Sequence, residues 1–182
     1  MINFKQYIRK ILITALIVIV CFFLQTNIFS RFQLAKVTPN ILLCVVSSFG
    51  FMNGQKKGLI VGFFCGLLVD IYMGYYLGIM AFIYMIIGFI NGFFKRLFFG
   101  DDLKLPLVLI GASDLIYGVL VYVFLFLTRN QYNFKFYFSY IMIPELVYTV
   151  LVSIFGYYAI LKITSLIDKL DKRGSRRLDG TF

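Results

Sequence analysis

Six apolar runs account for most of the chain, and polar or glycine-containing connectors separate them. A helix that crosses the hydrocarbon layer needs about 20 residues, with a usual range of roughly 17 to 25. The second and third runs are short by that standard, but their connector, MNGQKKG, holds two lysines that can lie at the headgroups. We therefore predict six crossings. The runs are Ile11–Phe29, Val37–Met52, Gly58–Met73, Leu77–Phe94, Leu105–Thr128 and Phe136–Leu161.

The connectors also indicate how the predicted helices are arranged. The third connector, around GYYLG, is very short, and its tyrosines suit a membrane interface. Short connections force neighbouring helices to run antiparallel. The predicted fold is therefore an all-α integral membrane protein, a compact bundle of six transmembrane helices. We divide the chain into a six-helix transmembrane domain, residues 1–165, and a basic cytoplasmic tail, residues 166–182.

Lysine and arginine side chains predict the orientation of this bundle. If the N-terminus is cytoplasmic, most of the 18 basic residues also lie on the cytoplasmic side, and Arg31, Lys36, Arg129 and Lys135 fall on the other side. Because cytoplasmic loops carry the excess of basic residues, both termini are expected in the cytoplasm. The basic tail has two interpretations, which are attraction to anionic lipid and docking of a cytoplasmic partner.

Composition restricts the class of protein further. Hydrophobic residues make up 61% of the chain and charged residues 14%, against about a quarter charged residues in an average soluble domain. Histidine is absent, which excludes a histidine-based triad, proton relay or metal site. Cys21, Cys44 and Cys65 lie inside apolar runs without a metal-binding spacing, and we interpret them as small core residues. We expect no enzyme activity, cofactor or metal, because no nucleophile–base pair can be assembled.

A glycine series with a period of four begins in the second run, and one of its positions holds an acid instead. In lipid no hydrophobic force draws helices together, so close backbone approach at small residues holds them. The series predicts tight helix packing, either inside this chain or with a partner's helix. Gly88 and Gly92 offer a similar contact on the fourth run. The series is Gly50, Gly54, Gly58, Gly62, Gly66, Asp70, Gly74 and Gly78.

Three acids lie within apolar runs: Asp70, Asp114 and Glu145. With a rise of about 1.5 Å per residue, all three fall between the midplane and the outer leaflet, so a shared polar cavity is geometrically possible. No lysine or arginine inside the runs can pair with them. Each acid is either neutral and hydrogen-bonded to neighbours such as Tyr117 or Tyr148, or part of a proton or substrate site.

Two prolines mark places where a helix begins or is disturbed. Pro39 and Asn40 open the second run, where the missing proline N–H costs nothing and Asn40 can cap the helix. Pro144 lies inside the sixth run, directly before Glu145, and removes one helix hydrogen bond. A kink there either shapes a cavity or reflects the tolerance of membrane helices for proline.

Pro39-Asn40-Ile41-Leu42-Leu43 opens the second run, and Gly58, Gly62, Gly66-Leu67-Leu68, Asp70 and Gly78 follow. This pattern resembles the family of the bacterial rod shape-determining protein MreD, over the whole length of the chain. The resemblance implies a multi-pass protein of the bacterial cytoplasmic membrane, with a fold similar to the substrate-binding subunits of energy-coupling-factor vitamin transporters. It implies no catalytic residue. The implied partners are MreC, MreB, and the peptidoglycan polymerase and transpeptidase of the elongation complex, together with membrane lipid and no nucleic acid.

Two functions of different classes are open at this point. The first is a non-enzymatic membrane scaffold of the cell-elongation complex, which binds MreC and helps to control cell shape and lateral peptidoglycan synthesis. The second is a small-molecule or lipid-binding transporter subunit, in which Asp70, Asp114 and Glu145 line an outward-facing acidic cavity. The residues expected to bind a partner or to pack helices in the first case are Pro39, Asn40, Gly58, Gly62, Gly66, Asp70, Gly74 and Gly78.

Overall fold

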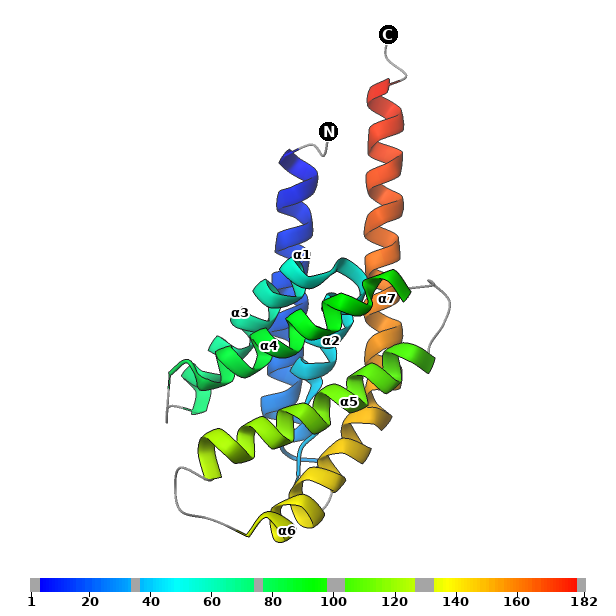
Figure 1. Cartoon of the computed structure of the whole chain (residues 1–182). Helices are drawn as coiled ribbons and strands as arrows, with labels where there is room; N and C mark the ends of the chain where they lie inside the picture. The colour runs from blue at the N-terminus through cyan, green and yellow to red at the C-terminus, as the bar shows by residue number, and fades with distance from the viewer. Residues whose placement is uncertain (1–3, 34–36, 74–76, 98–103, 127–132, 180–182) are drawn as a thin grey trace.

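The computed structural model describes residues 4–33, 37–73, 77–97, 104–126 and 133–179, and helices make up nearly all of them (Figure 1). Short π- or 3₁₀-helical segments, labelled η, continue several of the α-helices. The elements are α1 (Phe4–Phe23), η1 (Leu24–Phe29), α2 (Ile41–Asn53), α3 (Gln55–Met73), α4 (Ile79–Phe93), η2 (Phe94–Leu97), α5 (Lys104–Val121), η3 (Tyr122–Phe126), α6 (Phe134–Tyr137), η5 (Phe138–Met142) and α7 (Ile143–Asp179).

Within the described residues, four helical stretches are long and apolar enough to cross a membrane. They confirm the prediction of an all-α integral membrane protein. Two of the six predicted crossings are not among the four. One corresponds to α2, which has 13 residues, and the other to α3, whose 19 residues include Lys56, Lys57 and Asp70. The four stretches are Ile8–Phe29, Ile79–Arg96, Lys104–Leu125 and Phe134–Leu166.

The short helix α2 forms the centre of the bundle. Every residue from Ile41 to Phe51 is buried, so this helix is covered on all sides. Its neighbours are α1, α3, α4, α5 and α7. A helix that is apolar all round is expected to be surrounded in this way. Leu42 and Leu43 of α2 pack in one cluster with Tyr84 of α4, and all three side chains are fully buried.

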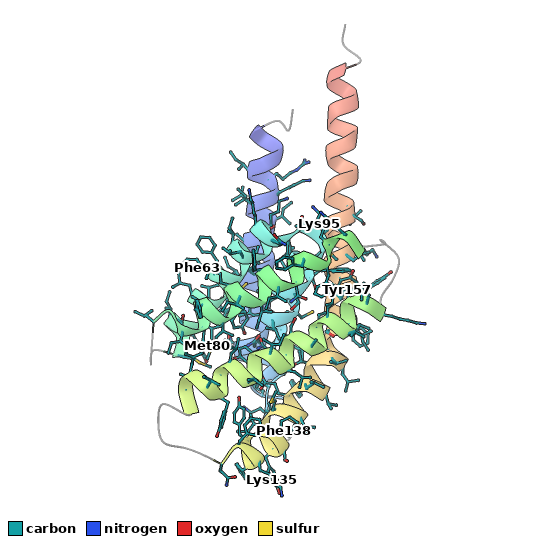
Figure 2. The ribbon with its side chains drawn as sticks, viewed as in Figure 1. Phe63, Met80, Lys95, Lys135, Phe138 and Tyr157 are labelled. Carbon is teal, nitrogen blue, oxygen red and sulfur yellow. The ribbon has the colours of Figure 1, made fainter. Side chains whose placement is uncertain are left out.

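Helices α1 and α7 stand at the edge of the bundle, and the start of α1 and the end of α7 lie at the same end of the molecule (Figure 1). Val18 of α1 belongs to the core, whereas Leu12 and Phe23 are each 63% exposed and face lipid in a membrane. Figure 2 shows Lys95 toward the end where α1 starts and Lys135 at the opposite end.

The chain changes helix type just before Pro144. The Ile143 N–H donates to the carbonyl oxygen of Phe138, five residues back, which makes η5 a wide π turn. Pro144 is then the second residue of α7, where the first N–H groups of an α-helix have no partner in that helix. Pro144, which has no N–H group, therefore lies at the junction of the π turn and the α-helix. Prolines and π turns are both common causes of irregularity in a helix.

Helix α7 is far longer than one membrane crossing. Its 37 residues span about 55 Å, whereas the hydrocarbon layer is about 30 Å thick. The apolar stretch ends at Leu166, and the helix continues to Asp179. Residues 166–179 of the predicted tail are thus helical and continuous with the sixth run. The domain boundary between residues 165 and 166 stays a prediction.

A single residue, Gly54, joins α2 to α3. Its φ of 97° lies in the region that favours glycine, and its N–H donates to the Gly50 carbonyl oxygen over 2.7 Å. The ammonium group of Lys95, just after α4, donates to the carbonyl oxygen of Asn53 over 3.2 Å. Asn53 is the last residue of α2, where the partial negative charge of a helix end favours a cation. The predicted connector MNGQKKG is therefore a tight turn, contacted by a residue that follows α4.

Candidate functional site

Three glycines of α3 place its backbone directly against α4, and the two helices lie side by side (Figure 1). A Cβ atom added at any of the three would collide with backbone atoms of α4. Such close approach gives the van der Waals contact that holds helices together in lipid, and larger side chains would prevent it. The colliding pairs are Gly58 with Gly88, Gly62 with Tyr84, and Gly66 with Met80 and Ala81.

Gly88 of α4 is the point where three helices meet. A Cβ atom added there would collide with Gly58 of α3 and would lie 3.0 Å from Cγ1 of Val46 in α2. A Cβ atom added at Gly50 of α2 would lie 2.6 Å from the Gly88 carbonyl oxygen. Helices α2, α3 and α4 therefore form one closely packed unit, called here the glycine unit. Its central contact has no room for one methyl group.

Two later positions of the predicted glycine series differ from the others. Gly74 lies outside the described residues. Gly78 has a φ of 103° and no atom within 4 Å of an added Cβ, so it serves a turn and not a helix contact. The face of Gly58, Gly62 and Gly66 is covered by α4, so a partner's helix cannot reach it unless α4 moves away.

Asp70 continues the same row of α3 and holds the start of α4. Its Oδ2 accepts hydrogen bonds from the N–H groups of Gly78 and Ala81, both at 2.9 Å, and its Oδ1 accepts from the Met80 N–H at 3.0 Å. The first N–H groups of a helix lack partners within the helix, and that end carries partial positive charge. Gly78, the residue at the capping position, has no side chain for this role. Asp70 of the preceding helix therefore caps α4, and this role explains why an acid that is only 2% exposed occurs here.

The start of α2 is buried among polar side chains from other elements. Asn40 accepts through Oδ1 from a backbone N–H in the first turn of α2 at 3.1 Å and from the Tyr84 hydroxyl at 2.7 Å. The Asn40 N–H donates to the Thr149 hydroxyl oxygen over 3.0 Å. Gln25 of η1 accepts from another N–H of the same turn at 2.9 Å. Residues from η1, α4 and α7 thus converge on one helix end.

Asp114 of α5 and Glu145 of α7 lie close to this helix end. The two helices pack against each other, and the two carboxyl groups are near enough to interact electrostatically. Asp114 is 3% exposed and contacts the side chain of Thr149, yet its Oδ1 has no hydrogen-bond partner among the described residues. The structure therefore pairs two of the three predicted acids and gives Asp70 a separate role.

The tyrosines expected to bond with the acids make other contacts. The Tyr117 hydroxyl lies 3.9 Å from the sulfur of Met80, which is a weak hydrogen bond. The Tyr148 hydroxyl donates to the carbonyl oxygen of Phe32 over 2.9 Å and so joins α7 to the segment after α1. Neither hydroxyl satisfies Asp114.

A second buried polar cluster connects α4 to α2 and α5. The Asn91 amide nitrogen donates to the Ser113 hydroxyl oxygen at 2.7 Å and lies 3.5 Å from the Ser47 hydroxyl oxygen. Sequence reasoning missed Asn91, and it also missed Gln25 and Thr149. A signal existed for Asn91, since an amide inside an apolar run is costly in lipid unless it bonds to a neighbouring helix.

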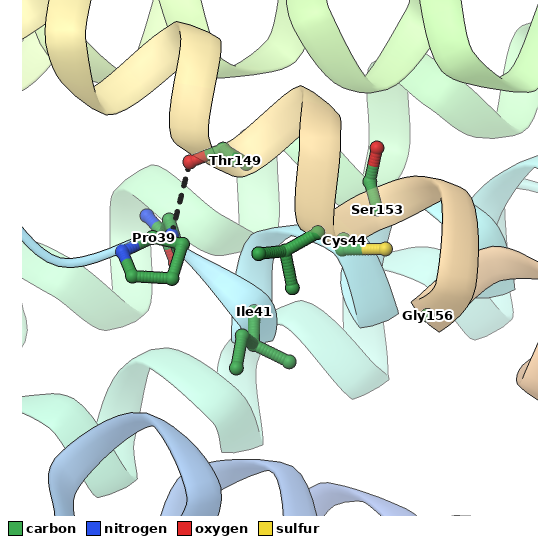
Figure 3. A pocket seen from close by; sticks show the side chains of 8 residues that line it. Pro39, Ile41, Cys44, Thr149, Ser153 and Gly156 are labelled. Carbon is green, nitrogen blue, oxygen red and sulfur yellow. Dashed lines mark hydrogen bonds between the residues drawn. The ribbon is translucent and has the colours of Figure 1, made fainter. Parts of the chain in front are cut away.

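A shallow cleft opens between the start of α2 and the first half of α7 (Figure 3). Pro39, Ile41 and Cys44 line one side, and Ser153 and Gly156 line the other. Its volume is about 10 Å³, room for about one water molecule, whereas ligand sites usually measure about 300–1,000 Å³. This cleft therefore gives no support to the hypothesis of a small-molecule transporter subunit.

The chain was compared with known families, curated proteins and solved structures. No curated protein and no solved structure matches it, so the predicted likeness to vitamin-transporter subunits stays a prediction. The family model of the rod shape-determining protein MreD matches residues 5–165. The matched region contains the glycine unit, the Asp70 cap and the pair of Asp114 and Glu145. Because the family model matches most of the chain, and the described residues form a helical membrane protein, the chain belongs to the MreD family of rod shape-determining proteins.

Proposed function

We propose that this protein is a non-enzymatic scaffold of the cell-elongation complex in the bacterial cytoplasmic membrane. It binds MreC and, in the assembled complex, MreB and the peptidoglycan polymerase and transpeptidase, and so helps to control cell shape and lateral wall synthesis. The family match over residues 5–165 carries this proposal. The glycine unit supports it, because interiors without free volume deform little and keep a surface in one shape.

The glycine row acts indirectly in this scaffold. Gly58, Gly62 and Gly66 are occupied by α4 and do not touch a partner themselves. They instead set the positions of the outward faces of the bundle, which present apolar side chains to lipid or to a partner's helix. Phe155 on α7, for example, is 80% exposed.

Co-purification tests the scaffold. MreC should be recovered with the tagged protein from solubilised membranes. Gly62→Leu should lose MreC together with its fold, because the new side chain meets the Tyr84 backbone. Gly111→Ala is the control, since its Cβ would lie 3.4 Å from Val150 Cγ2, an ordinary contact, and it should retain both. Folded wild-type protein that recovers no MreC would contradict the proposal.

The proposal includes six crossings, with the second one built in two parts. Residues 37–40 precede α2 without helical structure and cover up to about 13 Å, and the 13 residues of α2 add about 20 Å. Together they match a hydrocarbon layer about 30 Å thick. Non-helical backbone at this depth is tolerated where protein surrounds it, and Pro39 and Asn40 are both buried. The 19 residues of α3 reach about 28 Å.

The proposed orientation places both termini in the cytoplasm. The start of α1 and the end of α7 lie at one end of the molecule, as an even number of crossings requires. Lys95 lies toward that end and Lys135 at the other. A membrane-impermeant thiol reagent applied to spheroplasts should label Lys135→Cys and spare Lys56→Cys, with the three native cysteines replaced. The reverse labelling would refute this orientation.

A further inference from the structure

Asp114 of α5 and Glu145 of α7 lie near each other at the interface of these two helices. Glu145 and Thr149 are four residues apart on α7 and therefore share one face of that helix. Thr149 contacts the Asp114 side chain across the α5–α7 interface. The same hydroxyl oxygen accepts the N–H of Asn40 at the start of α2. Helices α2, α5 and α7 therefore meet at Thr149, beside the two acids.

No cation of the described chain neutralises this pair. Neither acid forms an ion pair with a described lysine or arginine, and the titratable groups that face them are tyrosines. The Oδ1 atom of Asp114 is buried without a hydrogen-bond partner in the described part of the structure. A buried carboxylate oxygen without a donor or a positive charge is costly, and in hydrocarbon the cost is greater. The tyrosines are Tyr84 of α4, Tyr117 of α5 and Tyr137 of α6.

We propose that Asp114 and Glu145 together hold one exchangeable positive charge, a proton or a small monovalent cation, between α5 and α7. Two carboxylates that share a site of low dielectric cannot both stay ionised without such a charge. One negative charge can remain at the site. Thr149, which contacts Asp114, also accepts the Asn40 N–H at the start of α2, and a helix start favours negative charge.

The two acids differ in burial, since Glu145 is partly buried and Asp114 is 3% exposed. In the proposed site the exchangeable charge therefore reaches Glu145 first and satisfies the oxygen of Asp114 that has no partner among the described residues. A proton would join the two carboxyl groups by one hydrogen bond. A monovalent cation would be bound by carboxylate oxygens and the Thr149 hydroxyl oxygen, which are the hard ligands that such ions prefer.

Thermal unfolding of the purified full-length protein in detergent tests the site. The folded state holds the charge and the unfolded state holds it less tightly, so stability should fall as the pH rises from 6 to 9 in the presence of the large cation choline alone. The expected fall is roughly 3 °C for each pH unit over which a proton is lost. If sodium or potassium ions restore the midpoint at pH 9 and choline does not, the occupant is the monovalent cation. If no salt restores it, the occupant is the proton.

One double variant and one control variant separate the site from general effects of pH. The double variant Asp114→Asn with Glu145→Gln carries no charge there, so its midpoint should not depend on pH or on sodium. Asp168→Asn changes an acid beyond the apolar stretch and should behave as the wild type does. A wild-type midpoint that is constant from pH 6 to 9 would overturn the proposal. A slope that persists unchanged in the double variant would overturn it as well.

Infrared spectroscopy provides a second measurement that needs no variant to fold. At pH 6 the wild-type protein without sodium should show the absorption band of a protonated carboxylic acid in a dry environment. That band should disappear as the pH is raised or as the alkali cation that restores the midpoint is added. A spectrum that shows only ionised carboxylates at pH 6, with no effect of sodium or potassium on the midpoint, would refute the site.

Discussion

Asp70 and Asp114 are both buried aspartates, 2% and 3% exposed, but the protein satisfies them in opposite ways. Asp70 accepts three backbone N–H groups from the start of α4, and these groups need an acceptor. Asp114 contacts one hydroxyl group and keeps one oxygen without a partner among the described residues. Asp70 therefore satisfies the first N–H groups of α4, whereas Asp114 keeps an oxygen that can still accept a hydrogen bond or bind a cation.

The two regions around these acids are built differently as well. The glycine unit brings backbones together, so its geometry depends on the absence of side chains. The α5–α7 interface instead includes contacts between polar side chains, such as Asp114 with Thr149. The two regions should therefore differ in how they respond to an added methyl group.

The largest effect should come from filling the glycine unit. Gly62→Ala puts a methyl group onto the backbone of Tyr84 and should destabilise the protein by about 3 kcal/mol or more. Gly111→Ala is the matched change at the α5–α7 interface, and it should be neutral or stabilising by up to about 1 kcal/mol, because alanine favours a helix over glycine. Thermal unfolding in detergent measures both. Equal losses would remove the distinction between the two regions.

The two aspartates should respond differently to the same substitution. Asp70→Asn keeps one acceptor oxygen for three N–H groups and loses the charge, so we expect a loss of about 2 kcal/mol. Asp114→Asn can put an amide NH₂ group in place of the carboxylate oxygen that has no hydrogen-bond partner among the described residues. Stability at pH 7 should therefore stay within about 0.5 kcal/mol of the wild type or increase. A larger loss at Asp114 than at Asp70, measured by the same unfolding assay, would reverse the comparison.

A smaller effect should separate two buried tyrosines that contact each other edge to face, with ring centres 5.5 Å apart. Tyr84→Phe removes the hydroxyl that donates to Asn40 and should cost about 1 kcal/mol. Tyr117→Phe removes only a weak contact to the sulfur of Met80 and should cost less than about 0.5 kcal/mol. The difference between the two unfolding midpoints is the measurement. If Tyr117→Phe proves the costlier change, the polar centre lies around α5 and not at the start of α2.

The smallest effect is expected at the exposed edge of the glycine unit. Lys95→Met removes the hydrogen bond to the last carbonyl of α2, and the loss should be about 0.5 kcal/mol or less. It should shrink further at high salt, since exposed charges are screened. Lys56→Met, on an exposed residue at the start of α3, is the control. A loss at Lys95 that high salt does not change would contradict an electrostatic origin.

The sequence indicated the close packing of α3, because glycines at every fourth position can lie on one side of a helix. It also indicated Gly88 as a similar contact on the fourth run, and the structure places Gly88 against Gly58. It did not indicate Tyr84 and Met80, whose backbone atoms meet Gly62 and Gly66. The six apolar runs located the helices but not their types. Composition cannot distinguish the extended residues 37–40 from the helix that follows, because Val37 and Ile41 are equally apolar. The start at Asn40 was the better signal.

The role of Asp70 could have been predicted from a different question. Gly78 precedes α4 and has no side chain to cap it, and the first N–H groups of a helix need an acceptor that the helix does not supply. Asp70 is the nearest acid before it in the sequence. The pairing of Asp114 with Glu145 could not be predicted in this way, because their contact depends on how α5 crosses α7. The π segment η5 was equally inaccessible, since it is defined by backbone hydrogen bonds alone.

The Asp70 cap also has a consequence for biosynthesis. While the ribosome and the insertion machinery deliver α3 alone, its acid has no donors, and the helix is not apolar enough by itself to be a candidate span. The three N–H groups that satisfy it arrive only with the next segment. The two helices should therefore enter the bilayer together as a preformed hairpin, and α3 should wait at the edge of the translocation channel until α4 has been synthesised.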